Sequence, residues 1–155
     1  MSRHLSIDIE TYSSVDITKS GLYKYVQSDD FEILLFAYSL DGGDVNIIDF
    51  ACGESLPEEI VQAVLDPNVQ NHAYNAAFEW YCLSKYFQIE PLSWLSQWRC
   101  TQLHGLYCGY TAGLAATGEA LGLPQEKRKL AAGKALIRTF CTPHIPNARN
   151  PTARV

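Results

Sequence analysis

The segment that most constrains this chain is residues 5–11, which read Leu-Ser-Ile-Asp-Ile-Glu-Thr. Apolar and polar side chains alternate along it, which is the period-two pattern of a strand with one buried face. The alternation places Asp8 and Glu10 on the same face, about 7 Å apart along the strand. Neighbouring carboxylates at the end of an apolar strand repel each other, so they favour a shared cation. The alternative interpretation is an acidic strand end that faces solvent.

Composition narrows the class of protein. A chain of 155 residues with 47% hydrophobic and 19% charged side chains predicts one globular domain with a sizeable core. The longest apolar run, residues 33–38, is far shorter than the roughly 18 residues of a membrane span, and the N-terminus does not read as a signal peptide. We therefore expect a cytoplasmic protein with no membrane partner. The five cysteines include no Cys-x-x-Cys pair and the four histidines are scattered, which argues against zinc.

Charge is distributed unevenly along the chain. Residues 1–95 carry 4 Lys or Arg and 15 Asp or Glu, a net charge of −11, whereas residues 96–155 carry 8 basic and 2 acidic side chains, a net charge of +6. An acidic half that holds cations and a basic half that holds an anion suit a metal-dependent enzyme acting on phosphates. The alternative is a charge fluctuation without functional meaning.

The pattern of apolar residues and turn residues predicts alternating strands and helices. The expected strands cover residues 5–11, 31–40, 45–50, 69–73 and 98–101. The expected helices cover residues 56–65, 75–87, 102–109, 113–121 and 133–140, with a short amphipathic piece at 22–26. Residues 41–44 (Asp-Gly-Gly-Asp) predict a hairpin turn. Residues 147–155 have almost no apolar side chains and predict a disordered tail after a domain over residues 1–146.

A second chemical motif lies in residues 71–80. Asn75 is a favourable N-cap residue, and Glu79 follows one turn later on the same helical face. Together with Asp8 and Glu10, Glu79 could complete an oxygen-only site for two Mg²⁺ or Mn²⁺ ions, as in-line hydrolysis of a phosphodiester requires. The alternative is an ordinary capped amphipathic helix with no ligand.

These motifs together resemble a known family. Residues 5–14 (LSIDIETYSS) resemble the first motif, Asp-x-Glu-Thr, of the DEDD 3′–5′ exonucleases, and residues 75–79 (NAAFE) resemble the second. Residues 98–110, 114–123 and 134–143 are similar to the exonuclease domain of phage-type family A (polymerase I-like) DNA polymerases. The resemblance implies an α/β, ribonuclease H-like fold with a mixed five-stranded sheet flanked by helices. It also implies a proofreading 3′–5′ exonuclease that removes nucleotides from a single-stranded DNA 3′ end with two metal ions.

The resemblance also implies roles for individual residues. Asp8, Glu10 and Glu79 would be catalytic metal ligands for Mg²⁺ or Mn²⁺, with Glu79 standing where the family most often has the shorter Asp. Thr11 and Asn75 would lie near the terminal nucleotide and bind the substrate.

The third motif of the family, Tyr-x-x-x-Asp or His-x-x-x-x-Asp, does not follow the second motif here, because the last Asp of the chain is Asp66. The spacing does occur at Tyr12 and Asp16 and at Tyr25 and Asp29, but both pairs precede the second motif. We therefore expect an exonuclease-like domain that is incomplete at its C-terminus, lacks its C-terminal helix, and is weak or inactive alone. A polymerase domain would follow it in the full-length protein. The alternatives are a catalytically dead DNA-binding or structural domain and a stand-alone exoribonuclease of the same superfamily.

Overall fold

The structure is a computed structural model that describes residues 3–128, 132–143 and 147–148. Its strands are β1 (Arg3–Tyr12), β2 (Glu32–Leu40), β3 (Asn46–Asp49), β4 (Val69–Ala73) and β5 (Trp98–Cys100). Its α-helices are α1 (Ile17–Val26), α2 (Glu58–Leu65), α3 (Ala77–Phe87), α4 (Thr101–Tyr107), α5 (Leu114–Ala120) and α6 (Gly133–Phe140). Three 3₁₀ helices complete the set: η1 (Phe50–Cys52), η2 (Pro91–Gln97) and η3 (Gln125–Lys127).

The five strands form one mixed sheet in the order β3-β2-β1-β4-β5. β2 runs antiparallel to β1 and to β3, whereas β4 is parallel to β1 and to β5. The predicted hairpin turn joins β2 to β3: Asp41 and Gly42 have φ angles of 52° and 75°, and Gly43 N donates to Leu40 O at 2.9 Å. Two consecutive positive φ angles are typical of a type I′ turn, which here lies within the longer connection between Leu40 and Asn46. The predicted mixed five-stranded sheet is therefore confirmed.

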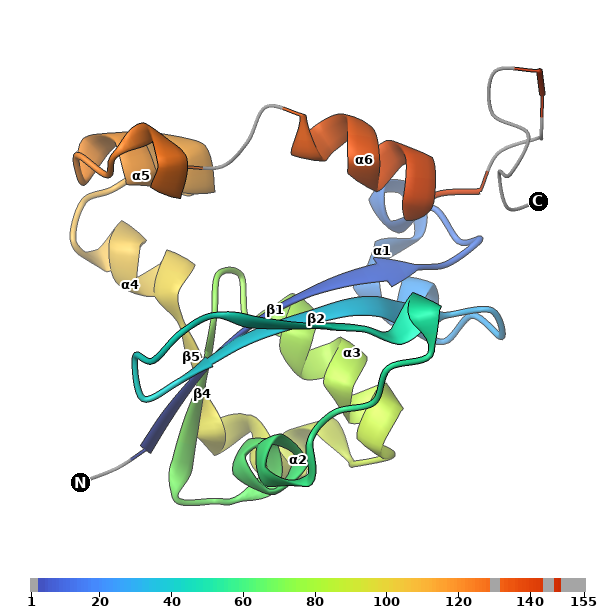
Figure 1. Ribbon diagram of the computed structural model, residues 1–155, viewed down its shortest axis with the longest axis horizontal. Helices are drawn as coiled ribbons and strands as arrows, with labels where there is room; N and C mark the ends of the chain where they lie inside the picture. The colour runs from blue at the N-terminus through green and yellow to red at the C-terminus, as the bar shows by residue number, and fades with distance from the viewer. Residues whose placement is uncertain (1–2, 129–131, 144–146, 149–155) are drawn as a thin grey trace.

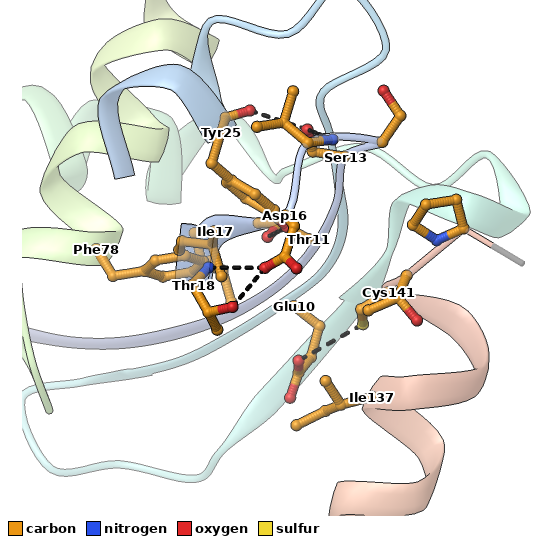
Figure 2. Close-up of a pocket in the computed structure, with 15 residues that line it drawn as sticks. Glu10, Thr11, Ser13, Asp16, Ile17, Thr18, Tyr25, Phe78, Ile137 and Cys141 are labelled. Atoms are coloured by element: carbon orange, nitrogen blue, oxygen red, sulfur yellow. Dashed lines mark hydrogen bonds between the residues drawn. The ribbon is translucent and has the colours of Figure 1, made fainter. Parts of the chain in front are cut away.

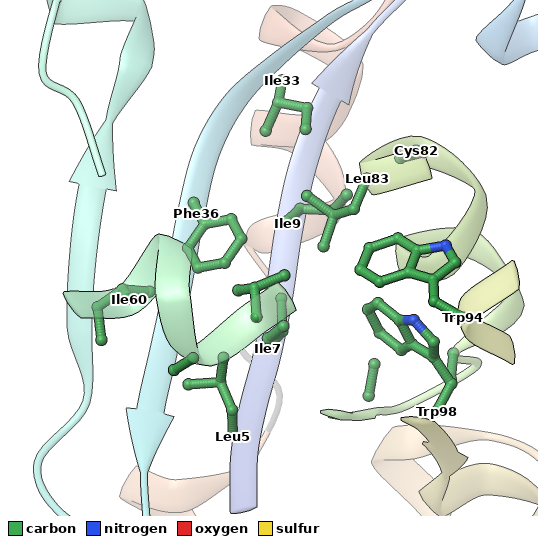
Figure 3. Close-up of a cluster of buried hydrophobic side chains, with 14 of the residues drawn as sticks. Leu5, Ile7, Ile9, Ile33, Phe36, Ile60, Cys82, Leu83, Trp94 and Trp98 are labelled. Carbon is green, nitrogen blue, oxygen red and sulfur yellow. The ribbon is translucent and has the colours of Figure 1, made fainter. Parts of the chain in front are cut away.

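The hydrophobic core lies on one side of the sheet. The apolar residues of β1 alternate as the pattern predicted, and Leu5, Ile7 and Ile9 are buried. They pack with residues of α2, α3 and η2, including Ile60, Leu83 and Trp94 (Figure 3). Helices α2 and α3 lie on this side, whereas α5 and α6 lie across the other side of the sheet (Figure 1). The second face of β1, which carries the acidic residues, is therefore directed toward the α6 side.

A β-bulge lies beside the acidic end of β1. Glu10 is opposite Leu35, but Thr11 is opposite Ile33, so Leu34 is an extra residue on β2. A bulge increases the local twist and changes the direction of the side chains that follow it. Accordingly, Thr11 and Tyr12 are both buried although they are neighbours in a strand. Thr11 continues the buried positions 5, 7 and 9 of the alternation, so the residue that departs from the pattern beside the bulge is Tyr12.

Several helix boundaries differ from the prediction, and those of α1 and α3 affect the site. α1 is longer than the expected piece at residues 22–26, because Asp16 caps its N-terminus and accepts a hydrogen bond from Thr18 N at 2.9 Å. α3 begins at Ala77 and not at Asn75, and the prediction that Asn75 is the N-cap was wrong. Asn75 has a φ of 66°, and Ala76 takes the cap position without a side-chain hydrogen bond. The chain needs the left-handed residue to turn from β4 into α3, and Asn tolerates that conformation better than most residues.

The remaining expectations concern the chain ends and membranes. The predicted disordered tail, residues 147–155, lies outside the described residues apart from positions 147 and 148. In the described part of the chain, no helix combines the length and the apolar character that crossing a bilayer requires.

Candidate functional site

The structure places Asp8 and Glu10 on the face of β1 opposite the core. Asp8 is exposed and Glu10 is half-buried. In the adjoining strand β2 they are paired with Ala37 and Leu35, respectively. Both carboxylates therefore stand on the polar face of the central strand, close to the point at which that strand ends.

Glu79 lies in the first turn of α3 and is 3% exposed. Its Oε2 atom has no hydrogen-bond partner among the described residues. Burial, and to a smaller extent the negative charges of Asp8 and Glu10, raise the pKa of Glu79 to about 8. The charges of Asp8 and Glu10 therefore act on Glu79, although the three residues are up to 71 positions apart in the sequence.

The character of this group fits a divalent cation. The side chains as they stand do not form a ready cage: the described residues contain no cluster of three or more His, Cys, Asp or Glu arranged for a metal. However, a buried carboxylate oxygen without a partner costs free energy, and repulsion by two further carboxylates adds to that cost. A cation would relieve both penalties, and an all-oxygen donor set suits Mg²⁺ or Mn²⁺.

A cavity of about 530 Å³ opens beside Glu10 (Figure 2). This volume lies in the range typical of small-ligand sites. Its walls come from the end of β1, the loop and first turn of α1, the first turn of α3, and the end of α6. They include Glu10, Thr11, Tyr25, Phe78 and Cys141. Two of the predicted site residues, Glu10 and Thr11, therefore share this cavity.

The other predicted residues lie outside the cavity wall. Asp8 and Glu79 are not among the described residues that line it, although both interact electrostatically with the site. Asn75 is exposed in the turn before α3, where its backbone carbonyl accepts a hydrogen bond from Phe78 N at 2.9 Å. Thr11 therefore lines this cavity and Asn75 does not, and a common contact with the terminal nucleotide stays a prediction.

Helix α6 forms a wall that the sequence analysis did not connect with the acidic residues. The Sγ atom of Cys141, directly after α6, lies 3.9 Å from Oε2 of Glu10 (Figure 2). Burial and the nearby Glu10 charge raise the pKa of the Cys141 thiol to about 11. A second cavity of about 440 Å³ also touches Glu10, and it is lined by apolar residues of β2 and α6 such as Leu35 and Phe140. Glu10 therefore stands between two cavities that share α6 as a wall.

Of the five cavity residues named above, three were not predicted as site residues: Tyr25, Phe78 and Cys141. Phe78 could have been found, because it precedes Glu79 in the second motif. Tyr25 and Cys141 carry no local signal, since their place in the site depends on how α1 and α6 pack against the end of β1.

Comparison with known proteins relates the chain to a polymerase sequence. No protein-family model matches the chain. It is 48% identical, over 146 residues, to a protein described as "DNA polymerase" from Bacillus phage SP02. The match covers 94% of this chain and 22% of the phage protein, so the chain spans about a fifth of the length of that relative.

Comparison with solved structures relates the fold to nucleases. Escherichia coli RNase D, described as an exoribonuclease involved in structured RNA processing, aligns with 85% of this chain and 30% of its own, with a TM-score of 0.51 and 17% identity. Brucella melitensis NrnC with bound Mg²⁺ aligns with 87% of this chain and 63% of its own, with a TM-score of 0.53 and 18% identity. The chain therefore has the ribonuclease H-like fold of these nucleases. Nearly the whole length of this chain is related in sequence to part of a phage DNA polymerase.

Proposed function

We propose that this chain is a metal-dependent 3′–5′ exonuclease domain of the proofreading type, acting on the single-stranded 3′ end of DNA. The observation that carries the proposal is the buried Glu79 carboxyl, whose pKa is raised by burial and by the charges of Asp8 and Glu10 at the end of the central strand. The identity to a phage DNA polymerase supports DNA as the substrate and a polymerase as the parent protein. The Mg²⁺ bound to NrnC supports a divalent cation.

In this proposal Asp8, Glu10 and Glu79 would hold the metal. Two bound Mg²⁺ or Mn²⁺ ions would supply a nucleophilic hydroxide from water and would stabilise charge on the leaving 3′ oxygen. The half-buried Glu10 carboxylate borders the cavity, so a cation held by it would attract a substrate phosphate in the cavity. Thr11 and Phe78 would contact the terminal nucleotide inside the cavity, and Asn75 would contact the strand outside it.

The first test is metal binding. Calorimetric titration with Mn²⁺ should show binding to the wild type that is at least tenfold weaker in Asp8→Asn. Asp44→Asn is the matched control, because Asp44 is an exposed carboxylate in the loop after the β2–β3 turn. Equal Mn²⁺ affinity in the wild type and Asp8→Asn would overturn the site.

The second test is hydrolysis. With Mn²⁺, a single-stranded DNA labelled at its 5′ end should be shortened stepwise from its 3′ end, slowly, because the chain offers three candidate carboxylates where the family resemblance implies four. Asp8→Ala and Glu79→Gln should each abolish the shortening while Asp44→Asn retains it. Degradation that persists in Asp8→Ala would contradict the proposal.

A second candidate function is DNA binding without hydrolysis. It is favoured by one observation: no Asp follows Asp66 in these 155 residues, so the Tyr-x-x-x-Asp or His-x-x-x-x-Asp spacing that would supply a fourth acid and a water-orienting group does not occur after the second motif. Metal-dependent retention of the labelled strand without any shortening would support this candidate over the first. The stand-alone exoribonuclease would instead be indicated by faster shortening of single-stranded RNA than of DNA of the same sequence.

A further inference from the structure

Tyr25, near the end of α1, is attached to the end of β1 at two points. Its hydroxyl oxygen lies 2.7 Å from Oγ1 of Thr11 in a buried hydrogen bond. Its backbone carbonyl accepts a second hydrogen bond, from Oγ of Ser13 at 3.0 Å. Thr11 is the last but one residue of β1, and Ser13 is the first residue after the strand. The end of β1 therefore holds both the backbone carbonyl and the side-chain hydroxyl of Tyr25.

The aromatic ring of Tyr25 also supports the cavity wall. Its centroid lies 6.2 Å from that of Phe78, with the two planes tilted by 42°, and 5.9 Å from that of Phe31 in an edge-to-face arrangement. Only 7% of Tyr25 is exposed. Tyr25 therefore contacts two other residues of the cavity, Thr11 through its hydroxyl and Phe78 through its ring.

The direction of the buried hydrogen bond follows from the chemistry of the two hydroxyls. A phenol is more acidic than an aliphatic alcohol, so it is the better donor. Burial raises the pKa of Tyr25 to about 12, so the phenol keeps its proton at physiological pH. When Tyr25 donates, Oγ1 of Thr11 is the acceptor, and the Thr11 proton stays available for a partner in the cavity.

We propose that Tyr25 is a positioning residue for the 3′-terminal nucleotide: it fixes the Thr11 hydroxyl as a donor toward the bound nucleotide and braces Phe78 against it. This inference rests on the proposed function, because it assigns the cavity to the terminal nucleotide. It adds a residue that lies outside both sequence motifs.

The experiment measures binding and not hydrolysis. The probe is a short oligothymidylate labelled at its 5′ end, with Ca²⁺ as the divalent ion, and binding is followed by fluorescence anisotropy. Tyr25→Phe keeps the ring and removes the hydroxyl, so its dissociation constant should rise about three- to tenfold, the effect of one lost hydrogen bond. Tyr23→Phe is the matched control, because Tyr23 is on the same helix and 64% exposed, and its affinity should match the wild type.

A double-mutant cycle with Thr11→Val distinguishes positioning from general packing. Thr11→Val alone should weaken binding by a similar factor, and adding Tyr25→Phe to it should cause no further loss. Equal affinity of Tyr25→Phe and wild type would overturn the inference, as would independent, multiplying effects of the two substitutions. Urea unfolding of each variant confirms that the proteins compared are folded.

Failure of the inference is distinguishable from failure of the proposed function. If the wild type does not bind the oligonucleotide, the proposed function is wrong and this inference falls with it. If the wild type binds and Tyr25→Phe binds equally well, only the role of Tyr25 is wrong.

Discussion

At the scale of single residues, the site is dominated by a conflict between burial and charge. Glu79 is nearly inaccessible, while Asp8 and Glu10 add negative charge nearby. Without a cation, burial and the neighbouring charges disfavour the ionised form of Glu79, so its pKa rises to about 8. A metal ion would compete with that proton, so metal binding and protonation of Glu79 should exclude each other.

This conflict predicts how stability depends on pH in metal-free buffer. The pKa of Glu79 is raised from 4.5 to about 8, so the folded state binds its proton more tightly than the unfolded state does. Its contribution to stability is complete below pH 4.5 and is lost as pH rises through about 8. Glu79→Gln should remove this dependence, which reaches at most about 1.4 kcal/mol per pH unit. Urea unfolding in EDTA from pH 5 to pH 9 measures it, and equal slopes in both proteins would contradict it.

The same repulsion predicts that removing one charge stabilises the metal-free chain. Asp8→Asn should raise the free energy of unfolding at pH 8 by a few tenths to about 1 kcal/mol, a modest gain because Asp8 is exposed and its charge is screened. Urea unfolding in EDTA tests this expectation. Saturating Mn²⁺ should reverse the order of stability, because the wild type gains more binding free energy than Asp8→Asn.

At the scale of secondary-structure elements, the site depends on how α1 returns to the end of β1. α1 is interrupted at Gly21, which has φ 79° and ψ 166°. This backbone region is essentially restricted to glycine. The change of direction carries Tyr25 back to Thr11, so the glycine supports the cavity wall from outside it.

We therefore expect Gly21→Ala to destabilise the protein by about 1–3 kcal/mol. No atom lies within 4 Å of a Cβ built at Gly21, so the cost would come from the backbone conformation and not from a clash. Ser20→Ala is the control, since Ser20 is exposed in the same helix. Urea unfolding compares the two variants, and an unchanged midpoint for Gly21→Ala would contradict the expectation.

At the scale of the whole molecule, apolar surface is concentrated on the helices that follow β5. Large apolar side chains of α4, α5 and α6 are exposed, among them Leu103 at 63%, Tyr107 at 94% and Phe140 at 61%. The core side of the sheet contrasts with this, because it buries nearly all the apolar residues of β1 and β4. Contiguous exposed apolar surface favours association.

The chain alone should therefore self-associate in a concentration-dependent manner. Sedimentation velocity should show higher-order species that decrease in a variant carrying both Leu136→Ser and Phe140→Ser, since both side chains border the open cavity between α6 and β2 and are 57% and 61% exposed. Ile47→Ser is the control, because Ile47 is 62% exposed on β3 and is not among the residues that line the cavity under α6. A wild-type chain that stays monomeric at high concentration would contradict this expectation.

Local sequence predicted most elements because their signals are local. The alternation over residues 69–73 and the amphipathic run over residues 133–140 coincide with β4 and α6. Local signals were insufficient at α1, where a capping Asp16 extends the helix, and at Asn75, where the turn from β4 requires a positive φ. The sequence analysis also did not predict η2, whose residues are ordered by packing of Trp94 into the core.

The sequence by itself determined the acidic face of β1, because side-chain alternation in a strand needs no tertiary information. The class of fold was predicted from the family resemblance, and the residues that could hold a cation were predicted from their motifs. Only the tertiary structure decided which groups meet. It placed the buried Glu79, whose Oε2 has no hydrogen-bond partner among the described residues, within the field of Asp8 and Glu10. It brought Cys141 to 3.9 Å from Glu10 across 131 positions and joined Tyr25 to Thr11. It also brought Nδ1 of His4 to 2.9 Å from Nε2 of His72, although the histidines are scattered in sequence. These contacts depend on strand order and helix packing, which arise from burial of the whole core and not from any local pattern.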